Sequence, residues 1–221
     1  LELKERLPNT AILTVLAIFL SSAIGIPIGV LSAVKPNSFF DNIFTGLTFT
    51  AVGIPIFWQG IMLILIFSVF LGWLPSSGME LDIRHFILPT IALSTVSTAN
   101  ITRITRSTML DILKEDYVRT AKAKGLKDKI VVYKHALRNA LIPVVTIIGL
   151  RFGRLLAGAV LTETIFAWPG MGRMLVDAIR TNDFPLVQGS ILIFALLFAL
   201  VNLLVDVLYA YLDPRLQTKF E

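Results

Sequence analysis

The chain has 221 residues, of which 55% are hydrophobic and 16% are charged, with a net charge of +5 at pH 7 and a mean hydropathy of +0.78. Soluble globular domains contain about 25% charged residues, so there are too few charged side chains here to cover a water-exposed surface. This composition argues against a soluble enzyme and predicts a chain that lies largely in a lipid bilayer. The absence of cysteine excludes disulfides and thiolate chemistry.

Five segments are long and apolar enough to be predicted as membrane-spanning helices. They cover about residues 11–34, 43–71, 86–106, 139–162 and 185–212. A hydrocarbon core about 30 Å thick needs roughly 20 helical residues. The second span is expected to be tilted or broken near Gly53-Ile54-Pro55, and the third is the least apolar because it is rich in Ser and Thr. We therefore predict an all-α integral membrane protein with five transmembrane helices.

The distribution of Lys and Arg predicts the orientation of these spans. Ten of them lie between Arg103 and Arg138, and basic residues accumulate in short cytoplasmic loops. The loop at about residues 107–138 is therefore predicted to be cytoplasmic. Alternating outward from it places the N-terminus of this chain and a loop at about residues 163–184 outside, and the C-terminus in the cytoplasm. A soluble helical bundle is the alternative, but long uncharged stretches are hard to bury in so small a core.

The apolar residues of the cytoplasmic loop are ordered rather than scattered. Two runs at helical spacing stand on either side of Gly125: Leu110, Leu113, Tyr117, Val118 and Ala121 in the first, and Ile130, Tyr133, Leu137 and Leu141 in the second. This pattern predicts a helix, a glycine turn and a second helix. Such a hairpin must bury its apolar face against its own spans or against another protein.

Several motifs together resemble one family of membrane proteins. The run EDYVRTAKAKGL from Glu115 to Leu126 and the run HALRNALIP from His135 to Pro143 are similar to the coupling loop of ATP-binding-cassette importer permeases. The runs ILP at 87–89 and ETIFAWPGMG at 163–172 extend this resemblance over nearly the whole chain. Arg119-Thr120-Ala121 stands where most members have Glu-Ala-Ala, a departure that resembles the B-type permeases of dipeptide, oligopeptide and nickel importers.

The resemblance implies a set of partners and a location. By this resemblance the chain is expected to be one half of a permease heterodimer that works with two ATP-binding-cassette ATPase subunits and an extracytoplasmic solute-binding protein. It lies in the plasma (inner) membrane of a bacterium or archaeon, among membrane lipid, and no nucleic acid is involved. Family members normally carry one more transmembrane helix ahead of the first span predicted here, so we expect this chain to be a truncated form of the family core.

The chain is expected to be a non-catalytic subunit. It contains no Gly-x4-Gly-Lys-Ser/Thr phosphate loop, so ATP and Mg are expected on the partner ATPase subunits. We expect no catalytic residue, metal site or cofactor on this chain.

The residues expected to contact an ATPase lie in the hairpin. They are Tyr117, Arg119, Thr120, Ala121, Ala123 and Gly125. Alanine permits close approach, glycine permits a sharp turn, and Tyr117 is a candidate interface anchor. The alternatives are a plain helix C-cap for Gly125, an ordinary buried position for Tyr117 and simple cytoplasmic retention for the basic residues.

Three polar residues are candidates for the translocation pathway. Arg151 and Arg154 lie inside the fourth predicted span, where an ionised side chain costs at least about 2.5–3.5 kcal/mol unless it faces protein or water. Snorkelling to one interface is the alternative. Asn100 and the Ser/Thr row of the third span either line the same path or bond their own helix carbonyls. The pairs Gly25-x3-Gly29 and Gly149-x3-Gly153 predict close helix crossings.

The external loop carries the last group of candidates, which are Glu163, Phe166, Trp168 and Gly170. The resemblance implies that they dock the binding protein or gate the exit, while an interfacial aromatic belt is the alternative. Arginines in the pathway favour a peptide carboxylate over a nickel cation, so peptides are the expected substrate and nickel or its chelates the alternative. An ion-coupled secondary carrier is more distant, because such carriers tend to need intramembrane acids and only Asp206 lies within a span.

Overall fold

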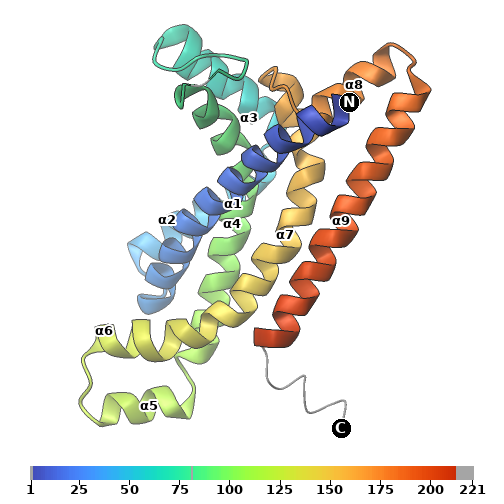
Figure 1. The fold of residues 1–221 in the computed structure, drawn as a ribbon. Helices are drawn as coiled ribbons and strands as arrows, with labels where there is room; N and C mark the ends of the chain where they lie inside the picture. The colour runs from blue at the N-terminus through green and yellow to red at the C-terminus, as the bar shows by residue number, and fades with distance from the viewer. Residues whose placement is uncertain (1, 81, 213–221) are drawn as a thin grey trace.

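The computed structural model describes residues 2–80 and 82–212, and every regular element in this part of the chain is helical (Figure 1). The elements are α1 (Glu2–Val34), α2 (Phe39–Gly53), α3 (Ile56–Leu63), the π-helix η1 (Ile64–Phe70), α4 (Arg84–Ile112), α5 (Asp116–Ala123), α6 (Asp128–Ile130), the π-helix η2 (Val131–Ala136), α7 (Leu137–Ile165), α8 (Met171–Arg180) and α9 (Phe184–Leu212). The predicted all-α fold is confirmed.

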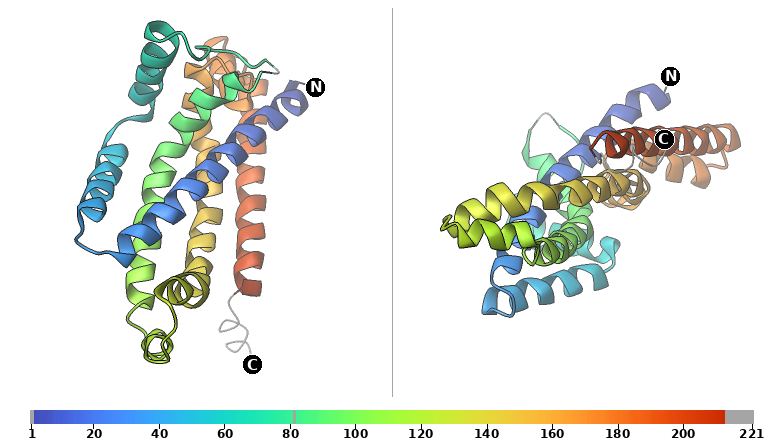
Figure 2. Two further views of the ribbon diagram at one scale, coloured as in Figure 1. Left: turned by 90° about the vertical axis from the view of Figure 1, so that its left-hand side faces the viewer. Right: turned by 90° about the horizontal axis from the view of Figure 1, so that it is seen from below.

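The long helices form one elongated bundle. Helix α1 crosses diagonally over α4 and α7, α9 runs beside α7, and α2 lies along α4 on the other side (Figures 1 and 2). Helices α5 and α6 project from one end of the bundle, whereas α8 and the N-terminus lie at the other end. The predicted cytoplasmic hairpin and the predicted external loop are therefore at opposite ends of the molecule.

Length and composition support membrane spans for part of the bundle. The stretches Glu2–Val34, Asp128–Gly153 and Phe184–Val205 are long and apolar enough to cross a bilayer, and the pair α2 with α3 and η1 also passes as a broken span. Helix α4, which contains the predicted third span, is not among them because its Ser and Thr side chains lower its hydropathy. The boundaries and number of the five spans stay predictions.

The second predicted span is sharply broken. Its two halves, Phe39–Gly53 and Ile56–Phe70, meet at an angle of 104°. The break follows from Pro55, which has no N–H and disfavours helical geometry in the residue before it. Ile54 is accordingly extended, with φ −85° and ψ 123°. The break lies where Gly53-Ile54-Pro55 predicted it.

Both small-x3-small pairs lie at close helix crossings. A Cβ added to Gly29 would lie 2.6 Å from the Cβ of Thr105 and 2.7 Å from the carbonyl oxygen of Thr102, and Gly25 meets the same helix α4 one turn earlier. On α7, a Cβ added to Gly149 would lie 2.6 Å from a methyl group of Val205 on α9. The absence of a side chain lets these backbones approach, so the predicted crossings are confirmed.

Candidate functional site

The loop predicted to be cytoplasmic folds as the predicted hairpin, which comprises α5, the turn at Gly125, α6 and η2. Gly125 has φ +76°, a left-handed conformation that glycine adopts without steric cost. It follows the C-cap residue Lys124, and its N–H donates to the carbonyl of Lys122 at 2.9 Å. Gly125 therefore both ends α5, as in the C-cap interpretation, and turns the chain back toward α6.

The hairpin buries its apolar face against its own chain. Val118 and Val131 are fully buried and pack with Ala121 against the end of α4, at Ile112 and Leu113. A second cluster, made of Val30, Ala33, Met109, Val132, Ala136 and Ala140, fastens the second limb to α1, α4 and α7. The hairpin thus has its own core and continues directly from the bundle.

The candidate contact residues divide between the two faces of α5. Tyr117, Arg119, Thr120 and Ala123 are exposed on the outer face. Ala121 is only 6% exposed, so its predicted close approach is to the hairpin core and not to a partner. Of the six candidate contact residues, the four other residues of α5 and Gly125 of the turn are exposed.

Tyr117 is positioned by the first turn of α7. The Nδ2 group of Asn139 donates to the Tyr117 hydroxyl at 2.8 Å, while the Tyr117 side chain stays 42% exposed. Tyr117 is therefore not the ordinary buried residue of the alternative interpretation. Its hydroxyl group is bound by Asn139, while much of the ring faces outward. This hydrogen bond links α7 to α5.

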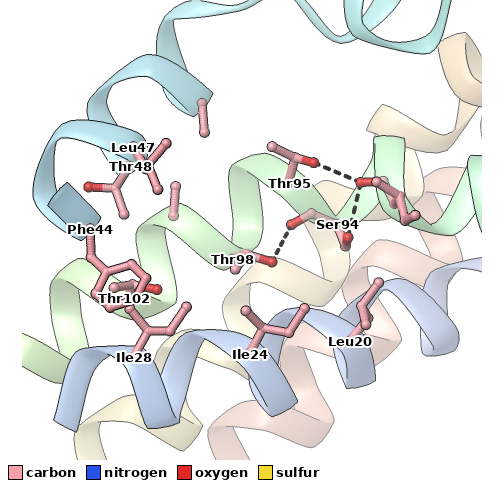
Figure 3. Close-up of a pocket in the computed structure, with 13 residues that line it drawn as sticks. Leu20, Ile24, Ile28, Phe44, Leu47, Thr48, Ser94, Thr95, Thr98 and Thr102 are labelled. Carbon is pink, nitrogen blue, oxygen red and sulfur yellow. Dashed lines mark hydrogen bonds between the residues drawn. The ribbon is translucent and has the colours of Figure 1, made fainter. Parts of the chain in front are cut away.

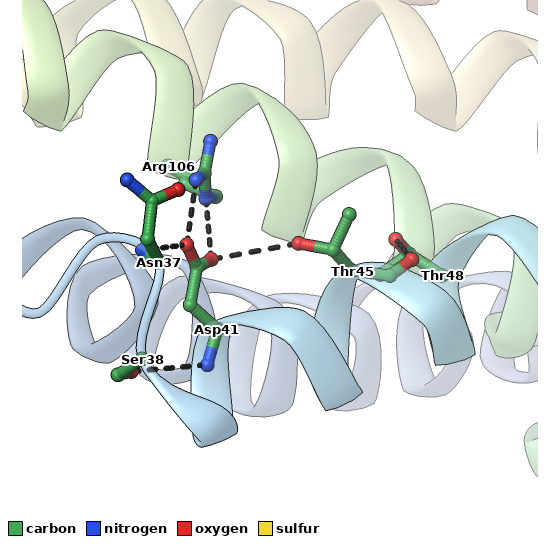
Figure 4. Close-up of polar contacts among 6 residues, drawn as sticks. All are labelled: Asn37, Ser38, Asp41, Thr45, Thr48 and Arg106. Carbon is green, nitrogen blue, oxygen red and sulfur yellow. Dashed lines mark hydrogen bonds and ion pairs between the residues drawn. The ribbon is translucent and has the colours of Figure 1, made fainter.

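A buried ion pair joins α2 to α4 just above the hairpin (Figure 4). The Nε and Nη2 groups of Arg106 donate to the two carboxylate oxygens of Asp41 at 2.6 and 2.7 Å, and Asp41 is 1% exposed. The backbone N–H of Asn37 donates to the same carboxylate at 2.9 Å. This pair could not be predicted from the sequence, because 65 residues separate its members and Arg106 is one of ten basic residues from Arg103 to Arg138.

The predicted pathway residue Asn100 bonds its own helix. Its Nδ2 group donates to the carbonyl of Val96 at 2.7 Å, and its Oδ1 accepts from Arg103 at 3.3 Å. The Ser/Thr row behaves in the same way, since the hydroxyl groups of Thr95 and Thr98 donate to carbonyls four residues earlier. Asn100, Thr95 and Thr98 therefore donate within α4, which matches the alternative for this row. The hydroxyl oxygen of Thr95 also accepts from Nε2 of Gln59 on α3 at 2.5 Å.

The Ser/Thr row nevertheless lines a cavity between α1, α2 and α4, of about 260 Å³ (Figure 3). Leu20, Ile24 and Ile28 of α1 form one wall, while Thr98 and Thr102 of α4 form another. The hydroxyl groups of Ser94, Thr95 and Thr98 donate to backbone carbonyls, so these residues present mostly apolar atoms to the cavity. Asn100 is not among the lining residues.

The two arginines of the fourth predicted span are both on α7. Arg151 is partly buried there and interacts with neighbouring groups. The side chain of Arg154 lies outside the part of the structure that is described. The pathway role of both residues stays a prediction.

The external segment is organised around Glu163, which is fully buried. Its Oε1 accepts from the hydroxyl of Thr10 at 2.6 Å, and its Oε2 accepts from the backbone N–H groups of Gly172 and Arg173 at 2.7 and 3.1 Å. Glu163 thereby caps the N-terminus of α8, where a negative group is favoured. Glu163 lies just after the predicted fourth span. Burial raises the pKa of its carboxyl group, whereas the hydrogen bonds from Thr10, Arg173 and Gly172 act to lower this pKa.

The glycines of this segment make room for the carboxylate. A Cβ added to Gly170 would collide with the Glu163 carboxylate, and one added to Gly172 would lie 2.5 Å from the Cα of Val160. Thr10 completes the arrangement, because its hydroxyl oxygen accepts from the N–H of Met171 at 2.8 Å. The run from Glu163 to Gly172 is thus a folded unit that ties α7 and α8 to the start of α1.

The aromatic residues of this segment do not fit the interfacial-belt alternative. Phe166 and Trp168 are 1% and 0% exposed, respectively, and neither lies in an interfacial belt. Trp168 donates from Nε1 to the carbonyl of Asn9 at 3.1 Å, and Phe86 meets its ring edge-on with centroids 4.9 Å apart. Buried Glu163, Phe166 and Trp168 do not offer direct contacts to a docking protein. Their docking or gating role stays a prediction.

Comparison with known proteins identifies the family. The family model for binding-protein-dependent transport system inner membrane components matches residues 25–218. The chain belongs to this family. It is 46% identical, over 99% of its length, to the dipeptide transport system permease protein DppB of Escherichia coli (strain K12), of which it covers 73%. It is 45% identical, over 96% of its length, to the oligopeptide transport system permease protein AppB of Bacillus subtilis (strain 168), of which it covers 70%.

Solved structures show the same fold. A chain from an inward-facing structure of the MetNI methionine ABC transporter superposes with a TM-score of 0.78 at 18% identity, and 96% of each chain is covered. A chain from a crystal structure of an amino acid ABC transporter gives a TM-score of 0.69, also at 18% identity. This chain is therefore a permease subunit of a binding-protein-dependent importer, and a multi-pass membrane protein.

Proposed function

We propose that this chain forms half of the translocation pathway of a peptide importer and that its hairpin receives the force of ATP hydrolysis. The observation that carries the proposal is the outer face of α5, where Tyr117, Arg119, Thr120 and Ala123 are exposed on a hairpin with its own buried core. Such a face suits docking into a groove of an ATPase subunit, because a helix transmits motion only when its base is rigid.

In this proposal the partner ATPase subunits supply the energy for transport. Two ATPase subunits bind ATP and Mg, and this chain holds no cofactor and catalyses no reaction. Closure of the ATPases on ATP moves the two hairpins of the permease pair together. Helix α4, whose end packs in the hairpin core, then tilts and reorients the cavity between the permease halves.

Peptides are the substrate class that the relatives favour. The proteins cited above are named for dipeptide and oligopeptide transport, and a further relative, 47% identical, is the di/tripeptide permease of Pseudomonas aeruginosa (strain UCBPP-PA14). Arg151 and Arg154 would meet a peptide carboxylate in the pathway. Nickel or its chelates remain the alternative cargo, and an ion-coupled carrier the more distant alternative.

The placement in the membrane follows from the basic hairpin. The hairpin and the C-terminus lie in the cytoplasm, and the N-terminus of this chain, the 163–184 loop and α8 lie outside in a bacterial or archaeal plasma membrane. The solute-binding protein then approaches the end of the bundle that holds α8. The buried Glu163 network fixes the surface that this protein meets.

The test uses the assembled transporter. The chain is co-expressed with its second permease, both ATPases and the binding protein, and ATP hydrolysis is measured with peptide-loaded and empty binding protein. We expect stimulation by the loaded form, and loss of it in the variants Arg119→Glu and Tyr117→Ala with membrane insertion unchanged. Lys134→Glu, in η2 and away from the outer face of α5, is the matched control and should keep stimulation.

Three outcomes would each contradict a part of the proposal. Full stimulation in both α5 variants would show that the outer face of α5 is not the docking surface. Uptake that survives ATP depletion but collapses with the proton gradient would favour the secondary carrier. Stimulation by a nickel-loaded but not by a peptide-loaded binding protein would replace the substrate and leave the coupling site intact.

A further inference from the structure

A second groove lies at the hairpin end of the bundle, between the end of α1, the start of α2 and the α6–η2 segment. Its volume is about 490 Å³, within the range of about 300–1,000 Å³ that is typical of ligand sites. Val30 and Val132 form a buried floor, and Leu31 and Val34, which are 56% and 40% exposed, form an apolar wall. No residue in the described ranges 2–80 and 82–212 covers that wall.

The rim of the groove is basic. Lys35, just beyond the end of α1, and Lys129, in α6, both line it and are both exposed. Within the part of the chain that the structure describes, neither lysine has a carboxylate within 4.0 Å. Asp128 is the acidic member of the lining, so the net charge of the lining is positive.

Aromatic side chains stand beside the lysines. Phe40 and Tyr133 line the groove and are 65% and 56% exposed. Exposed aromatic rings next to lysines at the end of membrane helices are typical of the membrane–water interface. The apolar surface continues from the groove along α2, where Ile43 and Leu47 are exposed. The groove therefore opens toward the region where lipid headgroups meet acyl chains.

We propose that this groove binds an anionic phospholipid, whose acyl chain lies on the Leu31 and Val34 wall and whose phosphate is held by Lys35 and Lys129. The complementarity is twofold, because an apolar wall and a positive rim match the two parts of such a lipid. A zwitterionic lipid satisfies the wall but gains less from the rim. The site depends on the chain being a membrane protein and not on the substrate of the importer.

The experiment measures lipid affinity of the assembled transporter. The complex is purified in detergent, stripped of lipid and titrated with phosphatidylglycerol or with phosphatidylcholine of the same acyl chains, and bound lipid is measured by native mass spectrometry. Lys35→Gln and Lys129→Gln should each weaken phosphatidylglycerol binding about fivefold, and the double variant about 25-fold. Phosphatidylcholine binding should change little. Val34→Trp, which fills the groove, should weaken the binding of both lipids.

Matched variants separate this site from diffuse charge. Lys127→Gln with Lys134→Gln makes the same charge change in the same segment, but neither residue lines the groove, so phosphatidylglycerol affinity should be unchanged. Lys35→Arg with Lys129→Arg keeps both charges and should also keep the affinity, which distinguishes loss of charge from misfolding.

Three results would overturn the proposal. The first is equal weakening by the Lys127/Lys134 pair and by the Lys35/Lys129 pair. The second is displacement of phosphatidylglycerol by inorganic phosphate, which would show that the acyl chain is not needed. The third is a photo-crosslinker at position 133 that captures a partner subunit instead of lipid in the assembled transporter, because the groove would then be a protein interface.

Discussion

The guanidinium of Arg106 binds the carboxylate of Asp41 through two hydrogen bonds of 2.6 and 2.7 Å, and so joins the first turn of α2 to the hairpin end of α4. Asp41 is almost fully buried, whereas the Arg106 side chain is 29% exposed. Arg106→Gln should lower the free energy of unfolding by about 1.5–3 kcal/mol, because it leaves a buried carboxylate without its cation. Thermal unfolding in detergent measures this loss.

Arg103→Gln is the matched control for that pair. Arg103 lies one turn earlier on α4, is exposed, and makes a 3.3 Å hydrogen bond to Asn100 of its own helix, so its loss should cost less than about 0.5 kcal/mol. The double variant Asp41→Asn/Arg106→Gln should lose less stability than the sum of the single variants. Additive losses would mean that the two residues do not depend on each other.

The α1–α4 crossing predicts a graded response to alanine. Gly29→Ala places a Cβ 2.6–2.7 Å from atoms of Thr105 and Thr102, whereas Gly25→Ala meets α4 at 3.0 Å. We expect a loss of about 1–3 kcal/mol for Gly29→Ala and a smaller loss for Gly25→Ala. Gly46→Ala, with no atom within 4 Å of its added Cβ, should be neutral or stabilising as a helix substitution. Equal melting temperatures for the variants at 29 and 46 would refute the close crossing.

The hydrogen bonds of Glu163 are expected to keep the start of α8 ordered. Glu163→Ala leaves the N–H groups of Gly172 and Arg173 without their acceptor, so the start of α8 should fray and exchange its amide hydrogens faster. Glu163→Gln keeps an oxygen acceptor and should lose less protection. Hydrogen exchange of residues 171–180 measures the effect. Unchanged amide protection in Glu163→Ala would show that the cap is dispensable. If the same variant slows transport without altering the affinity for the binding protein, this result would indicate a gating role.

The turn at Gly125 predicts a difference between two substitutions of similar size. Gly125→Asn should be tolerated, because asparagine visits the left-handed region, whereas Gly125→Val should strain the turn by about 1–2 kcal/mol. No atom lies within 4 Å of an added Cβ, so backbone conformation alone separates the two. ATPase recruitment should persist in the first variant and fall in the second. Equal recruitment would show that the hairpin does not need this turn.

Helix positions and local breaks could be predicted from the sequence because they depend on neighbouring residues. The broken span at Gly53-Ile54-Pro55 follows from proline chemistry, and the hairpin follows from apolar spacing on either side of Gly125. The crossings at Gly29 and Gly149 were also predictable, because small residues at four-residue spacing suit close backbones.

Contacts between distant segments were not predictable in this way. Nothing local marks Asp41 as the partner of Arg106. From the sequence, Glu163 looks like a surface acid at the end of a span. The groups that donate hydrogen bonds to its carboxylate, on Thr10 and Gly172, come together only in the folded chain. The burial of Ala121 and Trp168 could not be predicted for the same reason, since periodicity shows that a face is apolar but not which surface covers it.

Helix α4 connects two separate parts of the fold, one at each of its ends. Near its start Phe86 rests against Trp168 of the external segment, and at its end Ile112 packs in the hairpin core. Its 29 residues span about 44 Å at roughly 1.5 Å per residue. A tilt of about 10° about one end therefore displaces the other by roughly 8 Å, a distance that follows from that length. Under the proposed function, a small tilt of α4 imposed at the hairpin would therefore displace the Phe86 end of the helix by more than the width of an amino-acid side chain.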